Sequence, residues 1–186
     1  MSEPKRDLNE NVGDESQRAP DVDTLVAALH SRSGAVRQRA REALVYAGKP
    51  AVDLLIEALR ESDHQVQWEA AKALGTIADP AAAPALANQL DHTDFSVRWL
   101  AAEGLVSIGQ EALRPTLKIL AERGADGSIR SGAHHVLHGL GERGFSDKVA
   151  PILEALEGPD PDVRAARAAR AALYGSTEAE IEDRAE

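Results

Sequence analysis

The chain has 186 residues, a formal net charge of −10, 43% hydrophobic but only 3% aromatic residues, and no cysteine. The missing cysteine excludes disulfides, cysteine-ligated zinc and thiol nucleophiles, and the acidity argues against a nucleic-acid backbone as main partner, because phosphate binding needs a concentrated basic face. No run approaches the ~20 apolar residues that cross a bilayer, and no hydrophobic signal core opens the chain, so we expect a cytoplasmic protein.

Residues 1–19 are charged and show no apolar periodicity, which predicts a disordered tail. From residue 20 a short phrase recurs: a β-branched residue, usually followed by arginine, with alanine and leucine four and eight positions after the first. The five copies, of which the last is degraded, open at Val36, Val66, Val97, Ile129 and Val163. Their spacing of 30 to 34 residues leaves room for two short helices per unit, which must stack on neighbouring units to bury their apolar faces.

The units follow one plan in chain order: a first helix, a polar turn, a second helix that starts near the opening residue, and a closing glycine or proline. The fourth unit has a loop two residues longer and carries Gly132 and Gly139 in its second helix. Because glycine costs about 1 kcal/mol relative to alanine inside a helix, we expect this unit to be the weakest. Residues 176–186 form an acidic C-terminal tail.

These features predict an all-α fold, an α-solenoid of about five antiparallel helix pairs over residues 20–175. The outer face of a solenoid has no neighbour and must meet water. Arginines stand at both ends where inner units have alanine, and we interpret them as capping residues: Arg41, Arg167 and Arg170.

The phrase Val-Arg-x-x-Ala-Ala-x-Ala-Leu-x-x-Ile-Gly, seen at residues 66–77 and 97–109, resembles the HEAT repeat. The ~30-residue unit is similar to the short variety named after phycobilisome lyases. The resemblance covers residues 20–175. It implies that the chain is a scaffold, a bilin-attachment subunit or an iron-dependent deoxyhypusine hydroxylase, the kinds of protein in which such repeats occur. The hydroxylases hold iron with His-Glu pairs just after Val-Arg, and those positions here read Trp68-Glu69, Trp99-Leu100 and Ser131-Gly132, so we exclude that enzyme.

Arginine follows the opening residue in four of the five units. In every unit a residue with an acidic or hydroxyl side chain lies three positions before the opening residue. This row of arginines could bind anions. The resemblance to the family implies instead that such Asp and Arg side chains bridge neighbouring units, and we favour this structural interpretation. The acids also suit helix N-termini.

On the second helices, the residues two, three and six positions after the opening residue are predicted to face the concave surface. Both tryptophans of the chain, Trp68 and Trp99, occupy the same position in adjacent units, which places them roughly 10 Å apart. With Leu100 they would form an exposed patch that anchors a partner; the alternative is that both indoles only cover the core. The predicted rim is Arg39, Glu42, Glu69, Lys72 and Glu103, and the corresponding positions of the fifth unit are Ala165, Ala166 and Ala169.

His134 and His138 lie four residues apart on one predicted helix, a spacing that can grip a metal, with His135 between them. We favour packing between repeats over a metal site, because no supporting ligand stands beside them except Glu142. No phosphate loop, nucleophile elbow or meaningful Ser-His-Asp set is visible. We therefore expect no cofactor, no metal and no catalytic apparatus.

The leading hypothesis is a non-enzymatic scaffold or adaptor that binds a protein partner on its concave face. The resemblance implies an alternative, a subunit or chaperone of a phycobilin-type lyase, in which the aromatics and the three histidines would contact the pigment. DNA binding is disfavoured by the acidic charge and by Glu42, Glu69 and Glu103 on the predicted face. The oligomeric state is left open.

Overall fold

The computed structural model describes residues 21–175, and every regular element in that range is helical, as predicted. The elements in chain order are α1 (Val22–Ala28), α2 (Gly34–Ala47), η2 (Lys49–Ala51), α3 (Val52–Ala58), α4 (His64–Ile77), η3 (Pro80–Ala82), α5 (Ala83–Ala87), η4 (Asn88–Asp91), α6 (Phe95–Ile108), η5 (Gln110–Ala112), α7 (Leu113–Arg123), α8 (Gly127–Leu140), η6 (Gly141–Phe145), α9 (Ser146–Glu157) and α10 (Pro161–Tyr174). The two predicted tails, 1–19 and 176–186, lie outside the described residues. No helix within 21–175 combines the length and the apolar character that crossing a membrane requires.

Local chemistry sets where the second helices begin and end. The carboxylate of Asp63 accepts hydrogen bonds from the backbone N–H groups of Gln65 and Val66, and that of Asp94 does the same for Ser96 and Val97. These bonds satisfy N–H groups that have no partner inside the helix. At the other end, α2 and α6 stop at glycines with positive φ, Gly48 (68°) and Gly109 (86°), a conformation that glycine adopts without steric cost.

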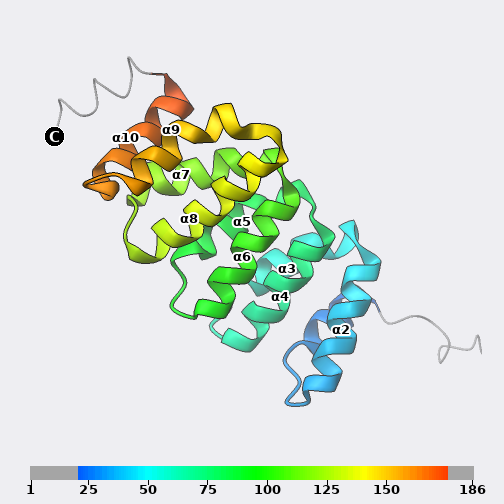
Figure 1. The fold of residues 1–186 in the computed structure, drawn as a ribbon. Coiled ribbons are helices and arrows are strands. Elements are labelled where there is room, and N and C mark those ends of the chain that lie inside the picture. The colour runs from blue at the N-terminus through cyan, green and yellow to red at the C-terminus, as the bar shows by residue number, and fades with distance from the viewer. Residues whose placement is uncertain (1–20, 176–186) are drawn as a thin grey trace, which may run out of the picture.

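The helices stack in two rows from α2 at one end of the molecule to α10 at the other (Figure 1). The first helices α1, α3, α5 and α7 form one row, and the second helices α2, α4, α6 and α8 form the other. The leucine eight positions after each opening residue is fully buried between the rows in four successive units: Leu44, Leu74, Leu105 and Leu137. The repeat phrase therefore marks the core, because its spacing keeps these side chains on the buried side of the second helices.

Glycines inside the second helices allow neighbouring helices to approach closely. A Cβ on Gly75 would lie 3.0 Å from the Cα of Gly104 on the next second helix. In α8, a Cβ on Gly132 would meet Leu90 Cδ2 at 2.9 Å, and one on Gly139 would meet Val106 Cγ2 at 2.8 Å. The glycines of the fourth unit thus allow neighbouring helices to pack closely. The prediction that this unit is the weakest rested on helix propensity alone.

The last helix pair is turned over relative to the others, which the sequence analysis did not predict. Its second helix, α10, packs against α7 of the first-helix row, while α9 packs against α8 (Figure 1). The cause lies in η6, a π-helical turn with Gly144 at φ 98°, which joins α8 directly to α9. The earlier pairs are instead joined through a glycine or aspartate and a short 3-10 turn, which carries the chain back to the first-helix row.

This reversal changes which side of α10 is buried. Val163 is 60% exposed, whereas the corresponding Val66 and Val97 are fully buried. Ala165 and Ala169 are buried completely, so their predicted place on the concave face is wrong. Their small side chains suit the close packing of α10 on α7.

Candidate functional site

The exposed side of α2, α4, α6 and α8 is called the second-helix face here. Positions two and six after each opening residue lie on it: Gln38 and Glu42, Trp68 and Lys72, Trp99 and Glu103, and Ser131 and His135 are all exposed or half-buried. Position three lies instead between adjacent second helices. Glu69 is 3% exposed, so the prediction that it is exposed on this face is wrong. Leu100 is half-buried and packs against the core, and its role in partner binding stays a prediction. Arg39 has the same position and is exposed, because no unit of the described chain packs on that side of α2.

Glu69 belongs to a buried charge cluster between α2 and α4. One carboxylate oxygen, Oε1, lies 3.4 Å from Arg37 Nε, and Oε2 accepts a hydrogen bond from Arg41. The two arginine side chains are 17% and 13% exposed. The interpretation of Arg41 as a water-exposed capping residue is therefore wrong, since it holds the first two units together. Arg170 is half-buried and Arg167 is exposed, as a cap on α10 requires.

The arginines after the opening residue do not bridge units through the aspartates. Arg37 donates to the Ser31 carbonyl at 2.8 Å, and Arg98 donates to the carbonyls of His92 and Thr93 at 2.5 and 3.0 Å. Each guanidinium thus closes the turn of its own unit, while the aspartates cap their own helices. The structural interpretation is right for Arg37 and Arg98, but the expected Asp-Arg pairing is wrong.

The two tryptophans have different surroundings. Trp68 is half-buried, with Lys72 Nζ 4.7 Å and Arg41 Cζ 5.6 Å from its ring centroid. Trp99 is 47% exposed. Within residues 21–175 no ring contact joins the two indoles: cationic side chains flank Trp68, and Phe95 and His135 flank Trp99. The joint patch of Trp68 and Trp99 stays a prediction, and Trp99 provides the more accessible aromatic surface.

Trp99 is the centre of an aromatic cluster on α6 and α8. Its ring stacks 6.4 Å from that of Phe95, which is 67% exposed, and lies 4.7 Å from that of His135. The His135 Nε2 is 2.6 Å from Glu103 Oε1, and Arg98 lies over the Phe95 ring. Phe95 and His135 thus join Trp99 across two units and form a ridge on the second-helix face.

Two pockets flank this ridge. The larger, called the Trp99 pocket, has a volume of about 770 Å³ and is lined by Trp99, Gly127, Arg130, Ser131, His134, His135, His138, Leu156 and Glu157. The smaller has about 190 Å³ and lies among Phe95, Arg98, Trp99, Ala102, Gly127, Ser128, Ser131, Gly132 and His135. The two pockets share part of their lining, namely Trp99, Gly127, Ser131 and His135. The larger is an open depression on the surface rather than an enclosed cavity.

The three histidines of α8 are each paired with a carboxylate. His134 Nε2 lies 3.0 Å from Glu157, His135 Nε2 lies 2.6 Å from Glu103, and His138 Nδ1 lies 3.8 Å from Glu142. The first two pairs join α8 to its neighbours, which agrees with the predicted packing between repeats. Across residues 21–175, no group of three or more His, Cys, Asp or Glu is arranged to hold a metal ion.

The remaining predicted rim residues lie on the second-helix face, at increasing distance along the array from the Trp99 pocket. Glu103 is next to the ridge through His135, Lys72 covers Trp68, and Glu42 accepts a hydrogen bond from Gln38 at 2.9 Å. Three residues at the aromatic cluster and its pockets were not among the predicted site residues: Phe95, Leu156 and Glu157. Phe95 has a signal in the sequence, since it lies four residues before Trp99 on the same helix. Leu156 and Glu157 have none, because the reversed last pair brings them to the pocket.

Another pair of a histidine and a carboxylate, His30 and Glu61, links the first two units and predicts a pH effect on stability. His30 Nε2 lies 2.6 Å from Glu61 Oε2, and this hydrogen bond raises the pKa of His30. Because the folded-state pKa exceeds the unfolded value, the contribution is fully present below about pH 6.5 and is lost as the pH rises through the folded-state pKa. Urea unfolding of wild type and His30→Gln between about pH 5 and 9 should show a small difference at the acid end that vanishes at the basic end. A difference that grows with pH would contradict the pairing.

Stacked helix pairs with aligned second helices define an α-solenoid of the HEAT and armadillo type. The chain belongs to the HEAT repeat family: the family model described as HEAT repeats matches residues 22–94 and 52–138. No curated protein matches the chain.

Several solved structures are similar. One is the complex of CpcE and CpcF of phycocyanin lyase from Nostoc sp. PCC7120, which is 25% identical, covers 95% of this chain and 72% of that chain, and has a TM-score of 0.51. An engineered protein is 20% identical over 90% of this chain and 86% of its own, with a TM-score of 0.46. A designed armadillo repeat protein in complex with the peptide (KR)4 is 18% identical over 88% and 90%, with a TM-score of 0.41. The predicted fold class and the resemblance to HEAT repeats are confirmed.

Proposed function

We propose that the chain is a non-enzymatic interaction module that binds a protein partner on the second-helix face, with Trp99 at the centre of the contact. The observation that carries the proposal is the ridge itself: a half-exposed indole that lines two pockets, with Phe95 exposed beside it. Interface hot spots are enriched in tryptophan, and exposed aromatic clusters on a soluble scaffold typically mark contact sites. Glu103, Lys72, Glu42 and Arg39 would contribute a polar rim that sets specificity more than affinity.

A binding comparison tests this proposal. Immobilised wild-type protein, Trp99→Ala and Tyr46→Ala are used to capture partners from a lysate of the source cells. Tyr46 is the matched control, because it is an aromatic residue on the same face, 94% exposed, on α2. We expect Trp99→Ala to weaken capture of the specific partner by roughly 30-fold, as a hot-spot loss of ~2 kcal/mol implies, and Tyr46→Ala to leave it unchanged.

The same experiment assigns the role of Trp68. Because Trp68 is half-buried under Lys72 and Arg41, Trp68→Ala should weaken capture less than Trp99→Ala does. Circular dichroism should show unchanged helicity in all three variants. Capture at the wild-type level by Trp99→Ala would reject the proposal.

A second candidate is a subunit or chaperone of a lyase that attaches or removes a tetrapyrrole. It is favoured by the Trp99 pocket, where an indole and the three histidines of α8 line a space of about 770 Å³, and by the similarity to a structure of phycocyanin lyase. Co-expression with the pigment tests it: the purified protein should carry visible absorbance that Trp99→Ala reduces. A colourless product would count against this candidate and leave the first one standing.

A further inference from the structure

The Trp99 pocket contains one cationic side chain without a partner. Arg130 lies on α8 and is exposed, and its side chain makes no hydrogen bond or ion pair with any residue in 21–175. The arginines at the same position of earlier units are engaged, since Arg37 and Arg98 close the turns of their own units. Arg130 therefore presents its donors to the pocket rather than to the chain.

The carboxylates around the pocket already have partners. Glu157 lies on the pocket wall against His134, Glu103 is paired with His135, and Glu142 lies near His138. Each of these acids lies against a histidine, and none of them forms an ion pair with Arg130. The unpaired donors of the lining are thus those of the Arg130 guanidinium, and the group that complements them is an acceptor with negative charge.

The exposed apolar surface of the pocket is the ring of Trp99, which is 47% exposed. Leu156, near the end of α9, is fully buried beneath the lining. A ligand that fits both Arg130 and Trp99 has a carboxylate next to a flat apolar group. Arginine binds a carboxylate through two parallel hydrogen bonds, which fixes orientation as well as affinity.

We propose that the Trp99 pocket receives an acidic side chain of the protein partner, next to an aromatic residue of that partner, and that Arg130 binds its carboxylate. This inference rests on the proposed function, because it names what the partner presents to the second-helix face. The aromatic side chain lies against Trp99, and the carboxylate reaches the guanidinium of Arg130.

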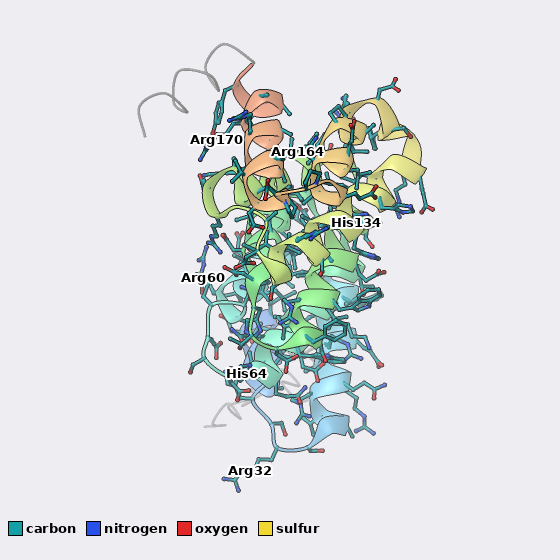
Figure 2. The ribbon with its side chains drawn as sticks, turned by 60° about the vertical axis from the view of Figure 1, so that its left-hand side comes forward. Arg32, Arg60, His64, His134, Arg164 and Arg170 are labelled. Atoms are coloured by element: carbon teal, nitrogen blue, oxygen red, sulfur yellow. The ribbon has the colours of Figure 1, made fainter. Side chains whose placement is uncertain are left out.

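The test uses full-length ¹⁵N-labelled protein with Trp68→Phe. Because the chain has two tryptophans, the single remaining indole N–H cross-peak then belongs to Trp99. Acetyl-Phe-Glu-amide and its neutral match, acetyl-Phe-Gln-amide, are titrated by NMR, and 2-naphthoate serves as a free aromatic acid. The protein variants are Arg130→Gln and the control Arg32→Gln. Arg32 is an exposed arginine at one end of the molecule, far from His134 (Figure 2).

We expect the glutamate peptide to shift the Trp99 cross-peak with roughly ten-fold higher affinity than the glutamine peptide, as one charge-assisted contact implies. Arg130→Gln should abolish this preference, and Arg32→Gln should keep it. Equal affinities for the two peptides, no shift with the glutamate peptide, or a preference that survives Arg130→Gln would overturn the inference. Binding of 2-naphthoate without binding of the peptide would overturn the assignment to a protein ligand.

The outcome is separable from that of the proposed function. If Trp99→Ala loses the partner while Arg130→Gln retains it fully, the interaction module stands and the carboxylate contact is rejected. If both variants bind the partner at the wild-type level, both proposals fail.

Discussion

Glu69→Ala should destabilise the protein by about 3 kcal/mol, because it removes the counter-charge from two largely buried arginines. Glu69 is 3% exposed, and its carboxylate is shared by Arg37 and Arg41 between α2 and α4. Guanidinium groups do not lose their charge at ordinary pH, so the variant leaves two buried cations without an anion. Urea unfolding followed by circular dichroism measures the loss.

The next junction of the array supplies the control. At the positions of Arg37, Arg41 and Glu69, the α4–α6 junction has Gln67, Ala71 and Leu100. The triple variant Arg37→Gln, Arg41→Ala, Glu69→Leu transfers this set to the first junction and should restore stability to near or above that of wild type, because a buried ion cluster can be replaced by apolar packing without loss. Glu69→Ala within about 1 kcal/mol of wild type would show that water screens the cluster.

Gly139→Ala should destabilise the protein although alanine is the better helix former. A Cβ at this position would lie 2.8 and 2.9 Å from the two γ-methyl groups of Val106, whose β-branched side chain has little freedom to rotate away. Overpacking of this kind costs about 1–3 kcal/mol, against a helix-propensity gain of about 1 kcal/mol. We expect a net loss of about 1 kcal/mol or more in thermal or urea unfolding.

Two matched variants isolate this packing effect. Gly127→Ala is the control, since nothing lies within 4 Å of its Cβ position and it shares helix α8; it should be neutral or slightly stabilising. Val106→Ala combined with Gly139→Ala should show a favourable coupling in a double-mutant cycle, because the smaller side chain accepts the new methyl group. Equal effects of the two glycine variants would mean that α8 is free to move away from α6.

Much of the fold could be predicted from the periodicity of single residues. The buried leucines at one position of each unit, the aspartate caps at Asp63 and Asp94, and the stacked helix pairs all follow from side-chain spacing that repeats every 30 to 34 residues. The position of Glu69 could not be predicted in this way. A charged residue normally marks a solvated face, and its burial requires two arginines from another unit.

The candidate site, like the fold, could be predicted only in part from the sequence. The sequence indicated Trp99 as a partner-binding residue and singled out the histidines of α8, and the structure places them around one pocket. It also indicated Trp68, which is half-buried with Lys72 over its ring and does not line this pocket. The contribution of Leu156 and Glu157 depends on η6, where the chain turns over after α8. Such a reversal depends on the length and geometry of a connection, which the apolar pattern of the helices does not encode.

The sequence by itself determined the class of fold, the buried leucine of each of the first four units, and the positions two and six that face solvent on their second helices. These properties depend on contacts between residues close in the chain or at equivalent positions of adjacent units, so periodicity carries them. Only the tertiary structure decided that Glu69 and Arg41 are paired, that the last helix pair is reversed, and that Trp99, Arg130 and Leu156 line one pocket. These depend on how units pack in three dimensions, where side chains from α6, α8 and α9 meet although the chain separates them by many residues.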